Sequence, residues 1–277
     1  MSIFNIEYWL TDSEISAIEY SDYWNNEEKE KSKEWYILDG DFSKMENYLQ
    51  KTGLLKDLMQ CVECLKVDFK FELHGQGIDL AAGNLWAVPY LFDLGKIDKL
   101  YCLEFSRHRL LKIGPKVLDH YSVPQEKIVL VLGSFYDLHI KDNSLDFVFL
   151  SQAFHHADKP DKLLSEIHRV LKPNGVVIII GEHILNYRKV QLKHAIKFVI
   201  STFIPDKVQQ ALFGETFQVK TLITKSGELP LTDPILGDHR YTNNEYWSFF
   251  AKYNFRIKHF KKQKSQFQSF VLVGNGV

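Results

Sequence analysis

Acidic and small residues follow the first two of a series of short apolar segments in the middle of the chain. The first segment contains Asp79 and runs into Ala81, Ala82 and Gly83, and the second ends in Glu104, 25 positions after Asp79. A glycine at such a place lets the backbone approach a ligand closely. A carboxylate at the end of a second strand is the usual acceptor for the ribose hydroxyls of an adenosine-containing ligand. The order of these residue types therefore favours a nucleotide-like ligand.

Hydroxyl, aromatic and imidazole groups follow the next three apolar segments. The third segment runs into Gly133-Ser134-Phe135, which offers a hydroxyl, a backbone N–H and a ring for a purine. The fourth ends at Ser151 and leads into His155, and the fifth ends in Glu182-His183. Histidine is the usual proton acceptor near neutral pH, so we expect His155 to be the catalytic base if the acceptor must lose a proton.

Three other histidines, His156, His183 and His239, are candidates for the same role. The ordinary alternative for each of the four is a hydrogen bond to loop backbone or a cap on the following helix. Sequence spacing does not separate these two interpretations.

The apolar segments have the length of strands that are buried on both faces. They span residues 78–82, 100–103, 128–132, 147–150 and 176–180. Such strands alternating with helical patterns indicate parallel βαβ units, which bind ligands at the carboxyl ends of their strands. Two further strands, 255–260 and 267–273, are close enough in sequence to form an antiparallel hairpin. The sequence predicts an α/β, Rossmann-like fold with a seven-stranded, mostly parallel sheet and one antiparallel strand.

Four regions follow from the pattern along the chain. Residues 1–66 are aromatic and helical in character and are expected to form an N-terminal helical cap, while 67–183 form the ligand-binding core. Residues 184–243 are an insertion on the substrate side, and 244–277 add a helix and the last strands to the core. We expect the cap and the insertion to cover the carboxyl edge of the sheet.

Composition excludes several classes of protein. The 277 residues include 34 Lys and Arg against 35 Asp and Glu, so the chain lacks the basic excess of a dedicated nucleic-acid binder. No apolar run approaches the length of about 18 residues that spans a bilayer, and membrane insertion is not expected. The first residues lack the pattern of a secretory signal, and three cysteines form no disulfide framework. The sequence predicts a cytoplasmic protein.

Residues 145–183 resemble a known family. Their sequence is LDFVFLSQAFHHADKPDKLLSEIHRVLKPNGVVIIIGEH, in which two histidines precede a D-x-P element and a later RVLKP-x-G element. This run is similar to the second half of class I S-adenosylmethionine-dependent methyltransferases, especially the small-molecule group that includes quinone-biosynthesis methyltransferases. The resemblance covers about residues 76–183, less than half of the chain.

The resemblance implies a role for each strand end in holding S-adenosylmethionine. Asp79 and the backbone of Ala81 to Gly83 would lie near the methionine part, and Glu104 would hold the ribose hydroxyls. Ser134 and Phe135 would flank the adenine, and Ser151 would complete the cofactor site. The sequence departs from the family pattern in its glycine loop and at the third strand. Ala81 and Leu85 occupy two glycine positions, and Ser134 stands where the family often has Asp.

The resemblance implies transfer of a methyl group to a small-molecule acceptor. A polar or sugar-bearing acceptor is favoured, because the insertion is polar and interrupted by Pro and Gly. The alternative is a catalytically silent relative that binds a ligand or partner, which the altered glycine loop leaves open. A nicotinamide-dependent oxidoreductase is disfavoured, because Gly75-x-Gly77 precedes the first strand instead of following it.

No metal site is predicted from the sequence. Cys61-x-x-Cys64 lies in a helical pattern without a second pair of ligands nearby. His183, Asp238 and His239 are metal-ligating residue types, but they have no spacing that is typical of a metal site.

Overall fold

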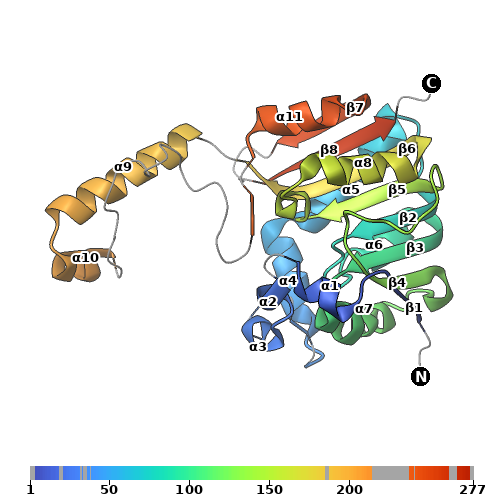
Figure 1. Ribbon diagram of the computed structural model, residues 1–277, viewed down its shortest axis with the longest axis horizontal. Helices are drawn as coiled ribbons and strands as arrows, with labels where there is room; N and C mark the ends of the chain where they lie inside the picture. The colour runs from blue at the N-terminus through green and yellow to red at the C-terminus, as the bar shows by residue number, and fades with distance from the viewer. Residues whose placement is uncertain are drawn as a thin grey trace.

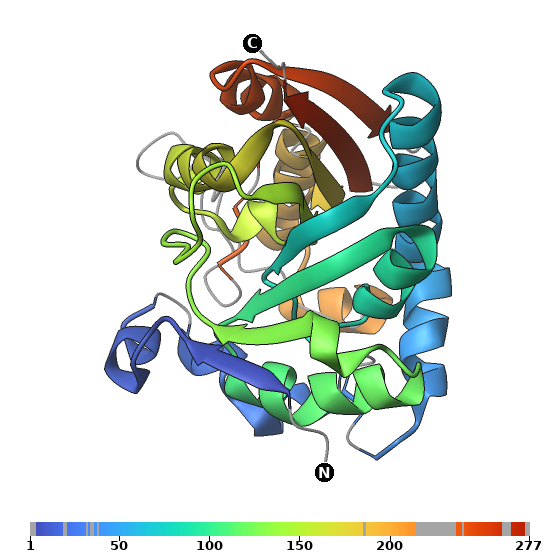
Figure 2. The ribbon, with the colours of Figure 1, turned by 90° about the vertical axis from the view of Figure 1, so that its right-hand side faces the viewer.

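An eight-stranded sheet with the strand order β1-β4-β3-β2-β5-β6-β8-β7 forms the centre of this computed structural model (Figures 1 and 2). The structure describes residues 4–18, 21–31, 33, 36–37, 39–184, 187–213, 237–239, 241–261 and 267–274. The strands are β1 (Asn5–Tyr8), β2 (His74–Leu80), β3 (Lys96–Glu104), β4 (Ile128–Leu132), β5 (Leu145–Ser151), β6 (Leu171–His183), β7 (Phe255–Lys261) and β8 (Phe267–Gly274).

The strand directions agree with the sequence-based prediction. Every neighbouring pair from β1 to β6 in the sheet is parallel, and β8 is antiparallel both to β6 and to β7. The expected mostly parallel sheet, its single antiparallel strand and the β7–β8 pairing are therefore confirmed.

The expected number of strands was wrong by one. Strand β1 pairs in parallel with β4, with Asn5 opposite Val129 and Tyr8 opposite Leu132. This strand has only four residues and its side chains are mostly exposed, so it lacks the apolar run that marks the other strands. It covers the outer edge of β4, an edge that would otherwise present unpaired backbone groups. The first 66 residues thus contribute a strand to the sheet as well as helices.

Helices cover both faces of the sheet. On one face lie α4 (Phe42–Thr52), α5 (Leu54–Asp68), α6 (Val88–Leu94), a π-helical turn (His108–Ile113) and α7 (Gly114–His120). On the other face lie α8 (Pro160–Val170) and α11 (Asn243–Ala251). Alternate residues of β5 serve the two cores: Phe147 belongs to the first and Val148 to the second. This alternation follows from the two-residue period of a strand.

Local sequence explains where several of these helices begin and end. The helix α8 begins at Pro160, whose fixed φ suits a first helical position. Between α4 and α5 the chain turns at Gly53, which has a φ of +73°. A left-handed conformation at that place favours glycine, because it has no Cβ. Thr242 caps α11 reciprocally with Glu245.

Three short helices and two 3-10 turns complete the described core. The helices are α1 (Asp12–Ser16), α2 (Ser21–Trp24) and α3 (Glu27–Glu30), and the turns span Gln125–Lys127 and Phe154–His156. The helices α1 to α3 lie beside the carboxyl edge of the sheet (Figure 1).

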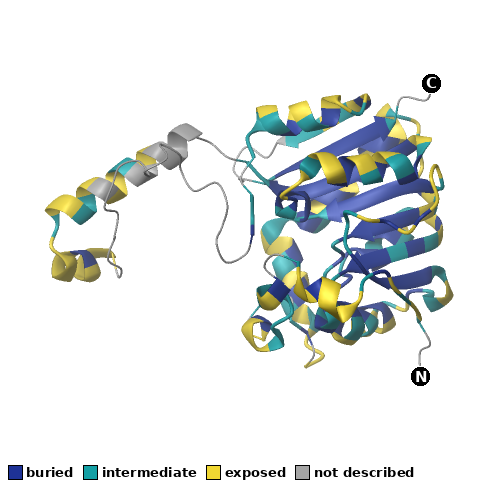
Figure 3. Cartoon of the chain, in the orientation of Figure 1, coloured by how far each residue is buried: buried dark blue, intermediate teal, exposed yellow. Residues whose placement is uncertain are grey.

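Only part of the described insertion lies at the carboxyl edge that we expected it to cover: residues 237–239 line the cavity there, whereas its two helices do not. Its helices α9 (Tyr187–Phe203) and α10 (Asp206–Phe213) extend away from the sheet (Figure 1). Leu192, Phe203 and Leu212 are more than half exposed, so these helices do not bury those side chains against the core (Figure 3). Residues 214–236 of the insertion lie outside the described residues. Among the helices of the described part of the chain, none has the length and apolar character needed to span a bilayer.

Candidate functional site

A cavity of about 570 Å³ lies at the carboxyl ends of the parallel strands. Its wall includes every site residue that the sequence suggested for a cofactor or a catalytic base: Asp79, Ala81, Gly83, Glu104, Ser134, Phe135, Ser151 and His155. Parallel strands end at one edge of a sheet, so residues far apart in sequence meet there. The structure thus brings the suggested residues together.

The loop after β2 keeps a glycine-like backbone despite its substitutions. Ala81 has a φ of +55°, Gly83 of +57° and Leu85 of +65°. A left-handed φ costs a residue with a Cβ about 1–2 kcal/mol, whereas glycine adopts it readily. Leu85 is fully buried, and its side chain packs into the core below the loop. The loop therefore turns as a glycine loop would, at a cost in strain at two positions.

Glu104 joins the loops that follow β2 and β3. Its Oε2 accepts the N–H of Gly83 at 2.9 Å, and its Oε1 accepts the N–H groups of Phe105 and Ser106, each at 2.9 Å. A carboxylate offers about four lone-pair sites, so these three bonds leave room for one more donor. Glu104 thus fixes the entrance loop and can still accept from a ligand.

Asp79 is almost completely buried beside Glu104. Burial, together with the neighbouring negative charge of Glu104, raises the pKa of Asp79 well above its usual value. A positively charged ligand group next to Asp79 would reverse that effect. The carboxyl group therefore suits a cationic ligand.

The residues after β4 supply a hydroxyl and aromatic rings. The Oγ of Ser134 accepts a hydrogen bond from the N–H of Tyr136 at 3.2 Å. The rings of Phe135 and Tyr136 pack edge to face, with their centres 4.6 Å apart. Tyr136 also lines the cavity, and its hydroxyl donates to Asp158. Tyr136 was missed from the sequence, although it follows Phe135 directly.

His155 is held by a buried carboxylate at the end of β6. Its Nδ1 lies 3.0 Å from Oε2 of Glu182. Burial alone would lower the pKa of His155, but the adjacent Glu182 carboxylate outweighs burial and raises it. Nδ1 faces Glu182, and the other ring nitrogen, Nε2, lies 3.9 Å from Oδ1 of Asp238.

Glu182 organises the whole turn that carries His155. It is fully buried and accepts the N–H groups of Ala153, Phe154 and His155 at 3.0–3.2 Å, as well as the hydroxyl of Tyr246 in α11 at 3.0 Å. Burial opposes its ionisation, but the charge of His155 and the side-chain hydrogen bonds from His155 and Tyr246 hold the pKa of Glu182 below its usual value. The position of His155 therefore depends on a charged, fully bonded carboxylate.

Residues 237–239 return from the insertion to this place. The N–H of His239 donates to the backbone carbonyl of His155 at 2.7 Å. This pairing brings Oδ1 of Asp238 to 3.3 Å from Nδ1 of His156. Burial and the positive charge of His155 lower the pKa of His156 well below its usual value, so His156 is neutral. All four histidines considered from the sequence (His155, His156, His183 and His239) line the cavity.

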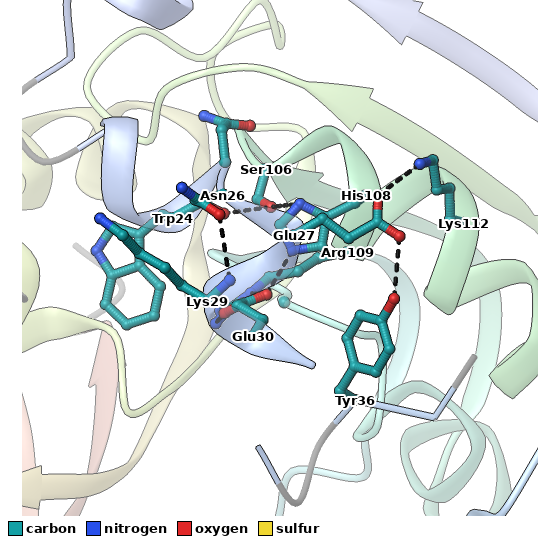
Figure 4. Close-up of polar contacts among 12 residues, drawn as sticks. Trp24, Asn26, Glu27, Lys29, Glu30, Tyr36, Ser106, His108, Arg109 and Lys112 are labelled. Atoms are coloured by element: carbon teal, nitrogen blue, oxygen red, sulfur yellow. Dashed lines mark hydrogen bonds and ion pairs between the residues drawn. The ribbon is translucent and has the colours of Figure 1, made fainter. Parts of the chain in front are cut away.

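The N-terminal segment forms another wall. Trp24 meets His156 edge to face at 5.3 Å, and the guanidinium of Arg109 lies 4.6 Å from the Trp24 ring centre. Glu30 is fully buried and binds both Arg109 and His108, which holds this segment against the core (Figure 4). Ser106 donates to the carbonyl of Trp24 at 2.8 Å. The aromatic character of the first 66 residues agrees with such a wall, whereas the paired ions behind it were missed from the sequence.

The cysteine motif lies elsewhere. Cys61 and Cys64 are free, buried thiols of α5, and burial raises the pKa of both. Neither lines the cavity.

The central part of the chain is similar in sequence to known methyltransferases. A family model described as a methyltransferase domain matches residues 78–179. Demethylmenaquinone methyltransferase from Lysinibacillus sphaericus is 29% identical over 104 residues, which make up 37% of this chain and 42% of that protein. The protein of the same name from Staphylococcus epidermidis is 32% identical over 106 residues, or 37% of this chain and 41% of that protein. The chain spans less than half the length of these curated relatives.

Solved structures resemble most of the chain. A protein from Galdieria sulphuraria, described as a sarcosine dimethylglycine methyltransferase, aligns with a TM-score of 0.52 and 15% identity over 84% of this chain and 88% of its own. A protein from Bacillus halodurans that is described as a methyltransferase aligns with a TM-score of 0.50 and 12% identity over 79% of this chain and 96% of its own. At these identities the likeness establishes the fold alone, and it confirms the predicted Rossmann-like class.

The cavity wall fits S-adenosylmethionine, the cofactor of this class. The carboxyl group of Asp79 would suit a positively charged group of the cofactor, and the ring of Phe135 on the same wall would suit an adenine. At Gly83 an added Cβ would meet only Arg109, at 3.9 Å, so the backbone is open to a ligand on that side. The volume lies in the range of small-molecule sites. Residues 78–179 of this chain therefore match a methyltransferase domain, and the strand ends of that domain form a cavity that fits S-adenosylmethionine.

Proposed function

We propose that the whole chain transfers a methyl group from S-adenosylmethionine to a small, polar acceptor. The observation that carries this proposal is the convergence of Asp79, Glu104 and His155 on one cavity within the matched domain. The acids suit the cofactor and the imidazole suits the acceptor. These two groups of residues lie on successive strand ends of the same sheet edge.

We propose a cofactor role for each strand end. Asp79 pairs with the positive charges of the methionine part, and the backbone of Ala81 to Gly83 lies against that part. Glu104 accepts one ribose hydroxyl through its remaining lone pair, while Ser134 and Phe135 flank the adenine. Ser151 ends β5 at the cavity, and its buried Oγ has no partner among the described residues. That hydroxyl is available to a ligand.

When bound, the cofactor supplies an activated methyl group on a sulfonium. The protein then has to hold the acceptor atom in line with that methyl group at a distance of about 3–3.5 Å and exclude water. Trp24 and Tyr48 of the N-terminal segment close one side of the cavity. His155 is the proposed catalytic residue, since its Nε2 lies on the cavity side and assists loss of the acceptor proton.

A polar acceptor, such as a sugar-bearing metabolite, suits the acceptor end of the cavity. His156, His183, Asp238 and His239 surround His155 there. Such a wall offers hydrogen bonds to the hydroxyl or amino groups of an acceptor. A cytoplasmic location also belongs to this proposal, because a reducing compartment suits three free, buried thiols.

Calorimetric titration of the full chain with S-adenosylmethionine tests the cofactor. We expect stoichiometric binding, which S-adenosylhomocysteine should block by competition. Release of S-adenosylhomocysteine in the presence of pooled sugar nucleotides and other polar metabolites then tests transfer. Absence of cofactor binding by the folded protein would reject the proposal. Binding without turnover would support the silent relative that the altered glycine loop left open.

A further inference from the structure

We propose that His155, His183 and Asp238 bind a divalent transition metal ion at the acceptor end of the cavity. Each of the three residues offers one ligand atom, and these atoms all lie within 4.8 Å of one another. All three residues line the cavity that contains Asp79 and Glu104. This inference deepens the proposed function and rests on it for the identity of the acceptor end.

The separation of the ligand atoms is close to that of a metal site. Ligand atoms about 2.1 Å from a tetrahedral ion are about 3.4 Å apart. Nε2 of His155 is already 3.9 Å from Oδ1 of Asp238, and the rings of His155 and His183 meet edge to face with centres 4.9 Å apart. Side-chain movements of roughly 1 Å would bring the three ligand atoms to the separations that a tetrahedral ion requires. His183 and Asp238 are only partly buried, which permits such movements.

A second observation points to the same ligand set. Nδ1 of His155 lies 3.0 Å from Oε2 of Glu182, so Nε2 is the ring nitrogen left to bind an ion, which would displace its proton. A buried carboxylate behind a histidine is the usual outer partner of a metal-binding imidazole, because it fixes the tautomer and increases the basicity of the ligating nitrogen. Glu182 is itself held by three backbone N–H groups and Tyr246. This outer partner is therefore already rigid.

A backbone hydrogen bond positions Asp238, the third proposed ligand. The bond from the N–H of His239 to the carbonyl of His155 fixes Asp238 beside the imidazoles. Oδ1 of Asp238 is buried and lies 3.3 Å from Nδ1 of His156. A carboxylate has two oxygens, so Asp238 can bind an ion and still accept from His156.

The donor set indicates the class of ion. Two imidazole nitrogens and one carboxylate oxygen suit zinc, iron or another first-row divalent ion better than magnesium or calcium. Three protein ligands leave an open coordination position. An ion there would polarise the acceptor group that enters the same cavity and make its proton easier to lose. With the ion bound, Nε2 of His155 is a ligand, and the ion takes over the part proposed for His155 as the base.

The test uses the full chain, stripped with a chelator and then titrated separately with Zn²⁺ and Co²⁺. We expect one equivalent of Zn²⁺ to bind and Co²⁺ to give visible absorption with nitrogen ligands. His183→Asn and Asp238→Asn should each weaken metal binding by at least about tenfold. His239→Asn is the matched control, because His239 neighbours Asp238 and lines the cavity but lies outside the three ligands. Its metal affinity should equal that of the wild type.

Titration of the same preparations with S-adenosylmethionine separates the two proposals. Cofactor binding without stoichiometric metal binding would overturn the metal site and leave the proposed function standing. An equal loss of metal affinity in the His239→Asn and His183→Asn variants would also overturn the proposed metal site, since the ion would then bind elsewhere. Metal binding that depends on His183 and Asp238, in a protein with no cofactor affinity, would support the site and reject the proposed function.

Discussion

Substitution of Glu30 would measure how much the buried ion pair between the N-terminal segment and the core contributes to the free energy of unfolding. The side chain of Glu30 is fully buried and accepts from Nε of Arg109 at 2.9 Å, from Nη2 of Arg109 and from Nε2 of His108. Burial alone would raise the pKa of Glu30, but the bonds from His108 and Arg109 outweigh it and lower the pKa from 4.5 to about 2. The ionised carboxylate is thus much more stable in the folded protein than in the unfolded chain.

We expect Glu30→Gln to destabilise the protein at pH 7 by about 3 kcal/mol. The lowering of the pKa from 4.5 to about 2 corresponds to about 3.4 kcal/mol at about 1.36 kcal/mol for each pKa unit. Loss of one partner from a buried ion pair costs about 3–5 kcal/mol in general, which agrees with this value. The measurement is the free energy of unfolding in urea, followed by tryptophan fluorescence.

The pH dependence tests the cause. A carboxylate with a lowered folded-state pKa contributes stability that is fully present above its unfolded value of 4.5 and is lost as the pH falls through about 2. The stability difference between wild type and Glu30→Gln should therefore be constant near pH 7 and decrease below pH 4.5. About 1.4 kcal/mol of the carboxylate's contribution should remain near pH 3.

The matched control lies on the same helix. Glu28 pairs with Lys31 at the surface, and its side chain is 78% exposed. Glu28→Gln should leave the free energy of unfolding unchanged within error, because solvent screens exposed pairs. A difference for Glu30→Gln below about 1 kcal/mol, or one that does not change with pH, would refute the account of the buried pair.

Four further predictions concern the cavity. Glu104→Ala should weaken S-adenosylmethionine binding by about 10- to 150-fold in calorimetry, the loss of one charged hydrogen bond; unchanged affinity in the folded variant would remove Glu104 from the cofactor site. His155→Ala should lower turnover by about 10²- to 10⁴-fold with nearly unchanged cofactor affinity, and an equal rate would exclude His155 from the mechanism. Ala81→Gly should raise the free energy of unfolding by about 0.5–1 kcal/mol, since it relieves a left-handed φ of +55°, and a loss of stability would contradict that reasoning. Because the pKa of Asp79 is raised without ligand and a cation would lower it, cofactor binding should release protons and weaken at low pH; calorimetry in buffers of different ionisation enthalpy measures the release, and Asp79→Asn should abolish it.

The sheet was predictable because its strands are defined locally. Five of them are continuous apolar runs bounded by turn residues, and burial on both faces of a parallel sheet requires such runs. The cofactor end of the cavity was predictable for the same reason. Once the strand ends are known, Asp79, Glu104 and Ser134 must share one edge.

Other features were not predictable because they arise from pairing across long stretches of chain. Strand β1 is polar and short, and only the free edge of β4 gives it a place in the sheet. Glu30 and Arg109 are 79 residues apart, and neither has a sequence neighbour that signals an ion pair. Asp238 lies beside His155 where the N–H of the next residue bonds to the His155 carbonyl, a contact between positions far apart in the sequence.

The two ends of the cavity differ in what keeps them in position. At the cofactor end, Glu104 binds backbone N–H groups of the two adjacent loops, so this end is fixed within the matched domain. At the acceptor end, Glu182 binds His155 and the hydroxyl of Tyr246 in α11. Asp238, a residue of the insertion, lies beside His156. Both of these outer elements lie outside the matched residues. The acceptor end therefore includes parts that the matched methyltransferase domain lacks. If the proposed function holds, the strand ends of the matched domain would present the methyl group, and Glu182, His155 and Asp238 would select what receives it.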